Sequence, residues 1–221
     1  MLTTAPQKTA RWASKMPAAA SRHTQEPVEA RIGPNSVLQL AQVVDLHLGN
    51  AVLQGLLAAA GMQDLPSENG LMPESPAARL HQTLRQQMPE QAAAFAREAG
   101  ERTGDYILAH RIPAPAQRVL RALPARLASP ILARAIGKHA WTFAGSGVFR
   151  VLPGRPMTFE LYDNPVVRGE SSPTPLCDWH AAVFQRLFNV LVSRQFRCTE
   201  ITCCAMGASA CRFSLQPVDS H

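Results

Sequence analysis

The last part of the chain contains a spaced set of cysteines that restricts how this region can fold. All five cysteines of the sequence lie between residues 177 and 211. Three of them, Cys177, Cys203 and Cys211, form a set with Glu200, and Gly207 lies midway between the last two. The string that starts at Glu200 has the pattern of a strand, a glycine turn and a second strand. A hairpin centred on Gly207 brings Cys203 and Cys211 opposite each other, with Cβ atoms about 4.5–5.5 Å apart.

These side chains are suitable ligands for a metal ion. A bend near the end of the strand would place Glu200 beside the two facing thiols, and Cys177, on a preceding helix, would complete the set. Three thiolates and one carboxylate suit a four-coordinate, borderline-soft ion, for which zinc is the obvious candidate. Because four protein ligands leave no open position, the predicted zinc site is structural. The alternatives are buried apolar cysteines or a Cys203–Cys211 disulfide, and no CxxC pair decides among them.

The complete pattern resembles the C-terminal signature of the 4-vinyl reductase domain family. That signature is a cysteine, a helix and then Glu-x-x-Cys-x-x-x-Gly-x-x-x-Cys-x-Phe. It matches this chain at Cys177, Glu200, Cys203, Gly207, Cys211 and Phe213. In phenol-sensing members of the family the same four ligand types hold zinc, so the resemblance implies zinc on the three cysteines and the glutamate. Cys198 and Cys204 have no counterpart in the motif.

Hydrophobic periodicity predicts helices in the first two thirds of the chain. Helical patterns run over residues 36–60, 75–88, 89–110 and 116–138. Pro89 separates the second from the third. Gly100 and Gly104 are expected to loosen the third, and Pro124 and Pro130 predict a kink or a break into two pieces in the fourth.

Strand patterns follow, and they define the expected fold class. Alternation from Trp141 to Phe149 and from Met157 to Tyr162 predicts strands, and a helix with Pro175 in its first turn precedes the cysteine hairpin. The expected fold is α+β, with an N-terminal helical layer packed on a small antiparallel sheet of about four strands that ends in the zinc hairpin. The family resemblance implies a fold similar to that of Golgi trafficking-complex subunits and a homodimer formed through the N-terminal helices.

Composition separates a tail from one folded domain. Residues 1–35 are rich in Ala, Ser, Thr, Pro and basic residues and have no acidic residue before Glu26. They predict a disordered basic tail, with an organelle transit peptide as the other interpretation, and residues 36–217 predict a single ligand-binding domain. The net charge is +6, but no basic stripe is interleaved with aromatic residues, so we expect no nucleic-acid partner.

The sequence offers a place for a flat ligand but no means of carrying a hydride. A vinyl reductase needs a reductant, and no Gly-x-Gly-x-x-Gly follows a predicted strand. No P-loop is present, and no spare cysteine set suits an iron–sulfur cluster. Gly145 and Gly147 fit a bulge or a close backbone approach. The predicted helix–sheet interface is apolar and suits a flat hydrophobic ligand, although its aromatic residues could equally fill the core. The candidate ligand-binding residues are Tyr106, His110, His139, Trp141 and Phe143.

Within the family, the length and layout most resemble a member of bacteriochlorophyll biosynthesis that was long labelled a 4-vinyl reductase. This resemblance implies a protein that binds a magnesium porphyrin or chlorin intermediate. It would carry that intermediate between membrane-associated pigment-synthesis enzymes or assist reduction of its vinyl group, with His110 or His139 as an axial ligand. Two other functions stay open: a genuine 8-vinyl (older numbering, 4-vinyl) reductase with an external reductant, and a sensor of small hydrophobic ligands. With no apolar run of about 18 residues and no signal peptide, we expect a cytoplasmic protein, at most peripheral to the photosynthetic membrane.

Overall fold

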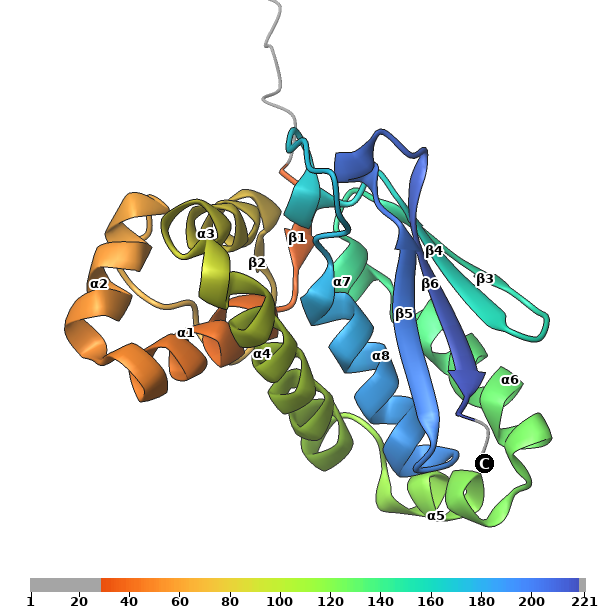
Figure 1. Cartoon of the computed structure of the whole chain (residues 1–221). Helices are drawn as coiled ribbons and strands as arrows, with labels where there is room; N and C mark the ends of the chain where they lie inside the picture. The colour runs from red at the N-terminus through yellow and green to blue at the C-terminus, as the bar shows by residue number, and fades with distance from the viewer. Residues whose placement is uncertain (1–28, 219–221) are drawn as a thin grey trace, which may run out of the picture.

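A computed structural model describes residues 29–218, and it confirms the predicted α+β class (Figure 1). The helices are α1 (Asn35–Leu48), α2 (Asn50–Ala59), α3 (Glu74–Gln87), α4 (Pro89–His110), α5 (Ala114–Ala122), α6 (Ala125–Lys138), α7 (Trp141–Ala144) and α8 (Asp178–Leu191). The strands are β1 (Arg31–Ile32), β2 (Met72–Pro73), β3 (Val148–Leu152), β4 (Met157–Tyr162), β5 (Phe196–Thr202) and β6 (Ala210–Pro217). Two 3₁₀ helices, η1 (Pro165–Val167) and η2 (Cys204–Met206), complete the described elements.

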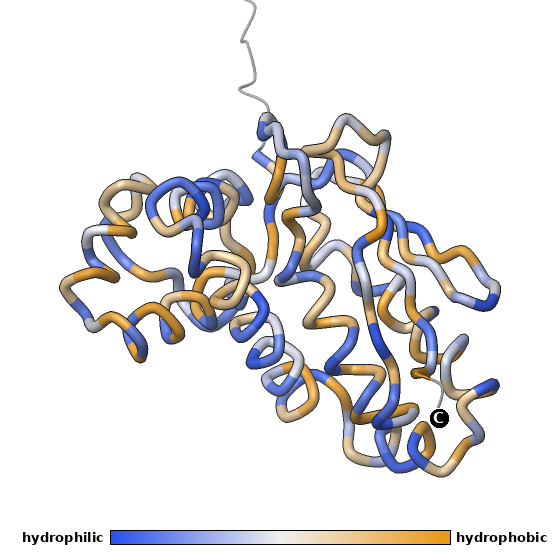
Figure 2. Tube along the Cα trace, viewed as in Figure 1, coloured by the Kyte–Doolittle hydropathy of each residue, from blue (hydrophilic) through white to orange (hydrophobic). Residues whose placement is uncertain are grey.

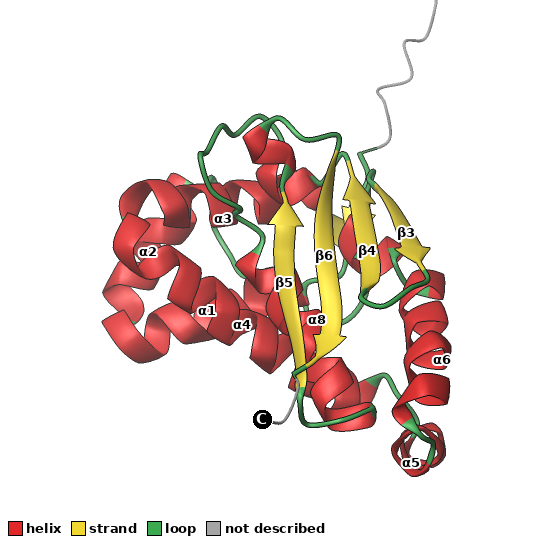
Figure 3. Cartoon of the chain, turned by 45° about the vertical axis from the view of Figure 1, so that its right-hand side comes forward, coloured by secondary structure: helices red, strands yellow, loops and turns green. Residues whose placement is uncertain are grey.

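One antiparallel sheet and one long helix form the centre of the molecule. The strands of this sheet lie in the order β3-β4-β6-β5, and every neighbouring pair is antiparallel. Figure 3 shows α8 crossing behind this sheet, and α4 packs on α8. Because α8 has the sheet on one side and α4 on the other, it is apolar around most of its circumference, with Trp179, Phe184 and Phe188 buried. In Figure 2, hydrophobic residues are concentrated along α8, and also along α1 and α2.

Helices α4 and α8 approach each other unusually closely through two glycines. A Cβ atom on Gly100 would lie 2.4 Å from the backbone oxygen of Trp179, and one on Gly104 would lie 2.7 Å from the Cβ atom of Arg186. The helix α4 runs unbroken through both positions. The expectation that these glycines loosen α4 was therefore wrong, because they instead remove side chains from a helix–helix contact.

Proline and glycine positions explain most helix boundaries. The breaks predicted at Pro89 and Pro124 are confirmed, whereas at Pro130, the other predicted position, the helix α6 continues without a break. The single helix predicted over residues 36–60 is instead divided at Gly49, whose φ of +84° interrupts the helical backbone. Helix α8 begins at Asp178, so Pro175 lies before the helix rather than in its first turn.

Two further expectations are corrected around the sheet. Trp141–Ala144 forms the short helix α7, and the first sheet strand begins only at Val148. The alternating aromatics imitate a strand, but the Ala144 N–H donates to the Ala140 carbonyl at 2.7 Å and keeps the chain helical. The predicted close approach at the glycines is confirmed, since a Cβ on Gly147 would lie 2.6 Å from the Tyr162 carbonyl oxygen.

The folded part of the chain starts earlier than residue 36. Strand β1 pairs with β2, Ile32 is buried, and the Gly33 N–H donates to the Thr142 carbonyl at 2.7 Å. The boundary expected after residue 35 was therefore placed too late. The rest of the expected tail, residues 1–28, lies outside the described residues.

Candidate metal centre

The cysteine hairpin has the predicted register. Thr202 pairs with Arg212 across β5 and β6, so the turn is centred on Gly207, as expected. Cys203 lies just past the end of β5, and the turn continues through η2 to Gly207, whose φ of +82° is left-handed. A left-handed residue closes such a turn most readily when it is glycine. The turn therefore holds Cys203 close to Cys211 at the start of β6.

A β-bulge brings Glu200 to the same side of the hairpin as Cys203. Residues three apart on a regular strand point to opposite faces of a sheet. The pairing shifts between Glu200 and Thr202, so that Ile201 is the extra residue. An extra residue reverses the alternation of side chains that follow it. The expected bend near Glu200 is thus confirmed, and its physical form is this bulge.

Four potential ligand atoms converge at this point. The ligand atoms of Cys177, Glu200, Cys203 and Cys211 all lie within 4.8 Å of one another. The Cys177 and Cys211 sulfurs are 3.5 Å apart, and each lies 3.8 Å from the Cys203 sulfur. These separations are too long for disulfides, and all five cysteines are free. Four ligands at the usual zinc–sulfur bond length of ~2.3 Å in a tetrahedron would place two sulfurs roughly 3.8 Å apart.

The N-terminus of α8 and the loop after β4 provide further groups that stabilise the ligand side chains. Cys177 occupies the N-cap of α8, where the partial positive charge of the helix favours a thiolate. Its backbone N–H donates to Glu200 Oε2 at 2.7 Å. The Asn164 amide donates to the sulfurs of Cys177 at 3.3 Å and Cys211 at 3.5 Å, and the Cys204 N–H donates to Cys211 Sγ at 3.3 Å. Hydrogen bonds of this kind stabilise negatively charged sulfur.

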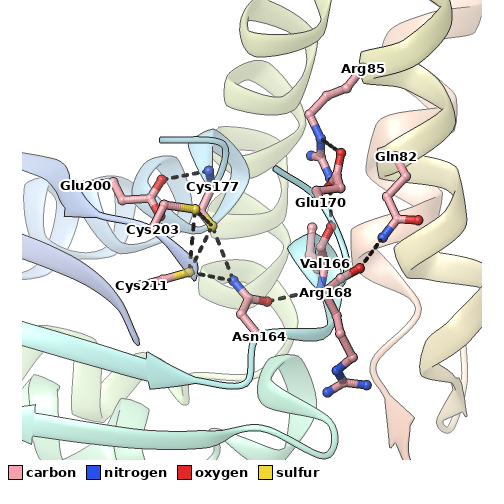
Figure 4. A network of polar contacts seen from close by, with 10 residues as sticks. All are labelled: Gln82, Arg85, Asn164, Val166, Arg168, Glu170, Cys177, Glu200, Cys203 and Cys211. Atoms are coloured by element: carbon pink, nitrogen blue, oxygen red, sulfur yellow. Dashed lines mark hydrogen bonds and ion pairs between the residues drawn. The ribbon is translucent and has the colours of Figure 1, made fainter. Parts of the chain in front are cut away.

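A polar network connects this site to α3 (Figure 4). Asn164 Oδ1 accepts from the Val166 N–H at 3.1 Å, and Arg85 on α3 donates to the Val166 carbonyl at 2.7 Å. Arg85 also forms a largely buried ion pair with Glu170. The loop that carries Asn164 is therefore fixed at both ends, by the sulfurs and by α3.

The electrostatics of the site favour a bound cation. Burial raises the pKa of the Cys177 thiol, whereas hydrogen bonds from Cys177 and Cys211 lower the pKa of Cys203. Burial, reinforced by the charge of Cys203, raises the pKa of Glu200 to about 8. Glu200 Oε1 is buried and has no hydrogen-bond partner in the described part of the chain. A divalent cation would allow these crowded acids to ionise together and would give Glu200 Oε1 a partner, so the residues fit a metal ion.

The five candidate ligand-binding residues lie in separate places. Tyr106 and His110 stack on each other near the end of α4, with ring centroids 4.5 Å apart. His139 and Trp141 are exposed at the junction of α6 and α7. Only Phe143 joins the aromatic core, 5.1 Å from Phe149 and 5.7 Å from Phe184. Two open pockets of about 450 and 300 Å³ lie beside the metal centre, but none of the five residues lines them. Their role in ligand binding stays a prediction.

Sequence reasoning missed two residues near this site. Asn164 contacts two of the sulfurs, yet it belongs to none of the motif positions, and only its place directly after β4 points toward the site. His180, in the first turn of α8, is fully buried among Phe143, Trp179 and Phe213, and neither ring nitrogen has a hydrogen-bond partner within residues 29–218. Burial lowers the pKa of His180 to about 4, so its imidazole is neutral.

Comparison with known proteins agrees with the cysteine motif. Residues 157–217 match the 4-vinyl reductase domain, which contains the β4 to β6 part of the sheet and the complete ligand set. The chain is 56% identical over 187 residues to a bacteriochlorophyll synthase 23 kDa chain of Cereibacter sphaeroides, covering 85% of this chain and 91% of that protein. A protein of the same description from Rhodobacter capsulatus is 46% identical over 189 residues, covering 86% and 88%. The chain therefore belongs to the bacteriochlorophyll-associated family of 4-vinyl reductase domain proteins.

Solved structures show where else the fold occurs. An H-NOX protein from K. algicida matches with a TM-score of 0.55 and 12% identity, covering 86% of this chain and 98% of that chain. A trafficking protein particle complex subunit 3 from Naegleria fowleri also matches, with a TM-score of 0.47 and 12% identity, covering 64% of this chain and 93% of that chain. The likeness to H-NOX proteins covers most of the described fold.

Within residues 29–218, no helix combines the length and apolar character needed to cross a membrane.

Proposed function

We propose that the protein takes part in bacteriochlorophyll biosynthesis by binding a magnesium porphyrin or chlorin intermediate. It carries this intermediate between pigment-synthesis enzymes or assists reduction of its vinyl group. The observation that carries the proposal is the 56% identity to a bacteriochlorophyll synthase 23 kDa chain over 91% of that protein. A shared fold alone would not support a function, but this likeness extends along nearly the whole sequence.

The fold is compatible with a planar ligand of this kind. Two further H-NOX structures, with TM-scores of 0.54 and 0.51, are described by the distortion of their haem or porphyrin. In this chain, Trp141 and Phe143 lie between a surface and the aromatic core, and the exposed imidazole of His139 is two residues away. Sites for small molecules are lined mainly by apolar and aromatic side chains with a few polar groups, and a neutral imidazole could be an axial ligand to magnesium. The Tyr106–His110 pair is the second candidate contact.

We also infer that Cys177, Glu200, Cys203 and Cys211 hold one structural zinc ion. The spacing of the sulfurs and the unpartnered Glu200 oxygen support zinc over a set of merely buried thiols. When bound, zinc would fix the hairpin against the N-terminus of α8. Metal analysis after gel filtration should find about one zinc per chain.

A homodimer through the N-terminal helices belongs to the same proposal. Leu46, Leu48 and Val52 are large apolar side chains exposed around the junction of α1 and α2. Such clustered exposure is typical of an interface. A dimeric mass in sedimentation analysis that becomes monomeric in Leu46→Glu would agree with it, and a monomeric wild type would exclude it.

A pigment titration tests the central proposal. Addition of a magnesium porphyrin or chlorin to the purified protein should shift the Soret band and quench tryptophan fluorescence, with a Kd of about 1 μM or tighter because a flat apolar ring leaves water. The Trp141→Ala variant should bind more weakly and retain its metal, whereas Leu65→Ala, a change of an exposed apolar residue in the loop between α2 and β2, should bind normally.

Two outcomes would overturn the proposal. One is an unchanged spectrum at saturating pigment. The other is conversion of the vinyl group to ethyl by the purified protein with NADPH, which would favour the reductase alternative.

A further inference from the structure

The positive charge of this protein is concentrated in one segment. Residues 106–159 contain no Asp or Glu, and their cationic residues are Arg111, Arg118, Arg121, Arg126, Arg134, Lys138, Arg150 and Arg155. Because the whole chain has a net charge of +6, the remaining residues together carry a net negative charge. The segment covers α5, α6, α7 and the β3–β4 hairpin. Figure 3 shows α5 and α6 at one end of the molecule, beside β3 and away from α1 to α3.

The cations of this segment lie at the surface, without a neutralising carboxylate among residues 29–218. All eight side chains are exposed. None of them has a carboxylate within ion-pair distance among residues 29–218, whereas Arg85, Arg97 and Arg186 elsewhere in the fold are paired. Unpaired charges of one sign, spread over neighbouring elements, produce a positive field over that face.

Exposed apolar side chains lie among these cations. Leu127 on α6 is 48% exposed, Ile131 is 51% exposed, and Val119 on α5 is 59% exposed. Leu127, Ile131, Arg134 and Lys138 are spaced by four, three and four residues, so they form one stripe along α6. The buried side of α6 is the opposite one, which includes Ala128, Leu132 and Ile136. Figure 2 shows this mixture of hydrophobic and hydrophilic residues along α5 and α6.

We propose that the exposed face of α5 and α6 docks on a lipid bilayer with anionic headgroups. Lys and Arg side chains would contact the headgroups, and Val119, Leu127 and Ile131 would enter the boundary between headgroups and acyl chains. A nucleic acid would also attract the cations, but it offers nothing to aliphatic side chains that point outward on the same stripe.

This surface is separate from the metal centre. Arg121 on α5 donates to the carbonyl of Val190, near the C-terminal end of α8, whereas Cys177 caps the other end of that helix. A helix of 14 residues is about 21 Å long. Variants on α6 should therefore leave metal content unchanged.

Cosedimentation of the full chain with lipid vesicles tests the proposal. The protein should bind vesicles of equimolar phosphatidylcholine and phosphatidylglycerol, and it should bind phosphatidylcholine vesicles far more weakly. The double variant Arg134→Gln/Lys138→Gln should bind the anionic vesicles about 30-fold more weakly, at ~1 kcal/mol for each cation removed near the surface. The matched control, Arg31→Gln/Arg79→Gln, also removes two exposed cations that form no ion pair among the described residues. They lie on β1 and α3, away from α5 and α6, so this variant should bind like the wild type.

A second variant tests the apolar contribution. Leu127→Ser/Ile131→Ser should weaken vesicle binding about tenfold, because less apolar area would leave water, and a melting curve would show that it is folded. The inference would be overturned by equal binding to neutral and anionic vesicles, or by an equal loss of binding in the α6 charge variant and in the control variant on β1 and α3. Binding to duplex DNA in place of vesicles would also overturn it, as would full vesicle binding by the α6 charge variant, which would point to the basic N-terminal residues.

Discussion

At the scale of single residues, the C-terminal site collects acids that cannot all ionise without a cation. Cys203 is the sulfur that its neighbours stabilise as a thiolate, and Glu200 is a buried carboxyl group whose pKa is raised to about 8. Asn164 and the Cys204 N–H supply donors to the sulfurs but no positive charge. The local chemistry therefore requires either protonation of several groups or a bound metal ion.

Replacing one ligand residue should show whether the site is protonated and metal-free or holds a metal ion. Cys211→Ser is expected to lose zinc and at least about 3 kcal/mol of the free energy of unfolding, because structural zinc contributes directly to folding. Cys204→Ser changes a neighbouring half-buried thiol outside the ligand set, and it should keep about one zinc and lose less than ~1 kcal/mol. Metal analysis and urea unfolding measure both quantities. A wild-type protein that is metal-free and equally stable would contradict the zinc proposal.

A buried histidine predicts acid sensitivity. His81 on α3 is fully buried, its Nε2 donates to the Ser36 carbonyl at 3.0 Å, and burial, with the charge of Arg85, lowers its pKa from 6.5 to about 3. The unfolded chain therefore binds a proton below pH 6.5 that the folded chain does not, so the free energy of unfolding falls as pH falls from about 6.5 toward 3.

The size of this effect follows from the ordinary pKa of histidine. Between about pH 7 and about pH 5.5, His81 should account for a loss of ~1.3 kcal/mol. Urea unfolding of wild type and His81→Gln at both values measures it, because the variant should lose that much less on acidification. Comparison with the variant removes the contribution of metal release. Parallel losses in the two proteins would show that His81 is not the responsible group.

At the scale of elements, the pair α4–α8 holds the N-terminal helices against the sheet. Gly100 allows this contact, since any Cβ there would overlap the Trp179 carbonyl oxygen at 2.4 Å and the Ala182 Cβ at 2.7 Å. The backbone of a packed helix cannot move aside as a flexible side chain can. The separation of the two helices is therefore fixed by the absence of one methyl group.

Two glycine substitutions test this contact. Gly100→Ala should lower the free energy of unfolding by about 2–3 kcal/mol, because overpacking costs more than the gain in helix propensity. Gly55→Ala on α2 is the matched control. A Cβ there has no atom within 4 Å, so this variant should be stabilised by about 0.5–1 kcal/mol. Stabilisation by both substitutions in a thermal or urea melt would refute close packing at Gly100.

At the scale of the whole molecule, the N-terminal end of the described fold packs against α7 and the loops that flank β3 and β4. Ile32 is buried, Gly33 bonds to Thr142 in α7, and Glu74 at the start of α3 accepts from the Ser146 N–H at 2.7 Å and from Arg168 at 3.0 Å. These contacts join the helical layer to the loops above β3 and β4. Residues 31 to 34 are thus part of the folded body.

Two truncations define where folding begins. Removal of residues 1–28 should leave the melting temperature nearly unchanged, because that stretch lacks apolar periodicity and cannot offset its own ordering entropy. Removal of residues 1–35 should lower it by more than about 5 °C, because it deletes Ile32, strand β1 and the Gly33–Thr142 bond. Scanning calorimetry distinguishes the two. Equal melting temperatures would mean that β1 contributes little.

The sequence by itself determined those features that depend on short spacings. The turn at Gly207, the strand Met157–Tyr162 and the helix breaks at Pro89 and Pro124 follow from the backbone preferences of a few adjacent residues. The ligand set was found for the same reason, because three of its four members lie within one hairpin.

Only the tertiary structure decided the features that depend on distant contacts. The Asn164 amide reaches sulfurs 13 and 47 residues away, and α7 replaces a predicted strand because local helical hydrogen bonds outweigh an alternating pattern. The expectation for Gly100 and Gly104 was wrong because these glycines make room for α8, and no spacing within α4 reveals that contact. The candidate ligand-binding residues lie in separate places for the same reason. The period of a helix tells which residues share a face, but only packing determines which element that face contacts.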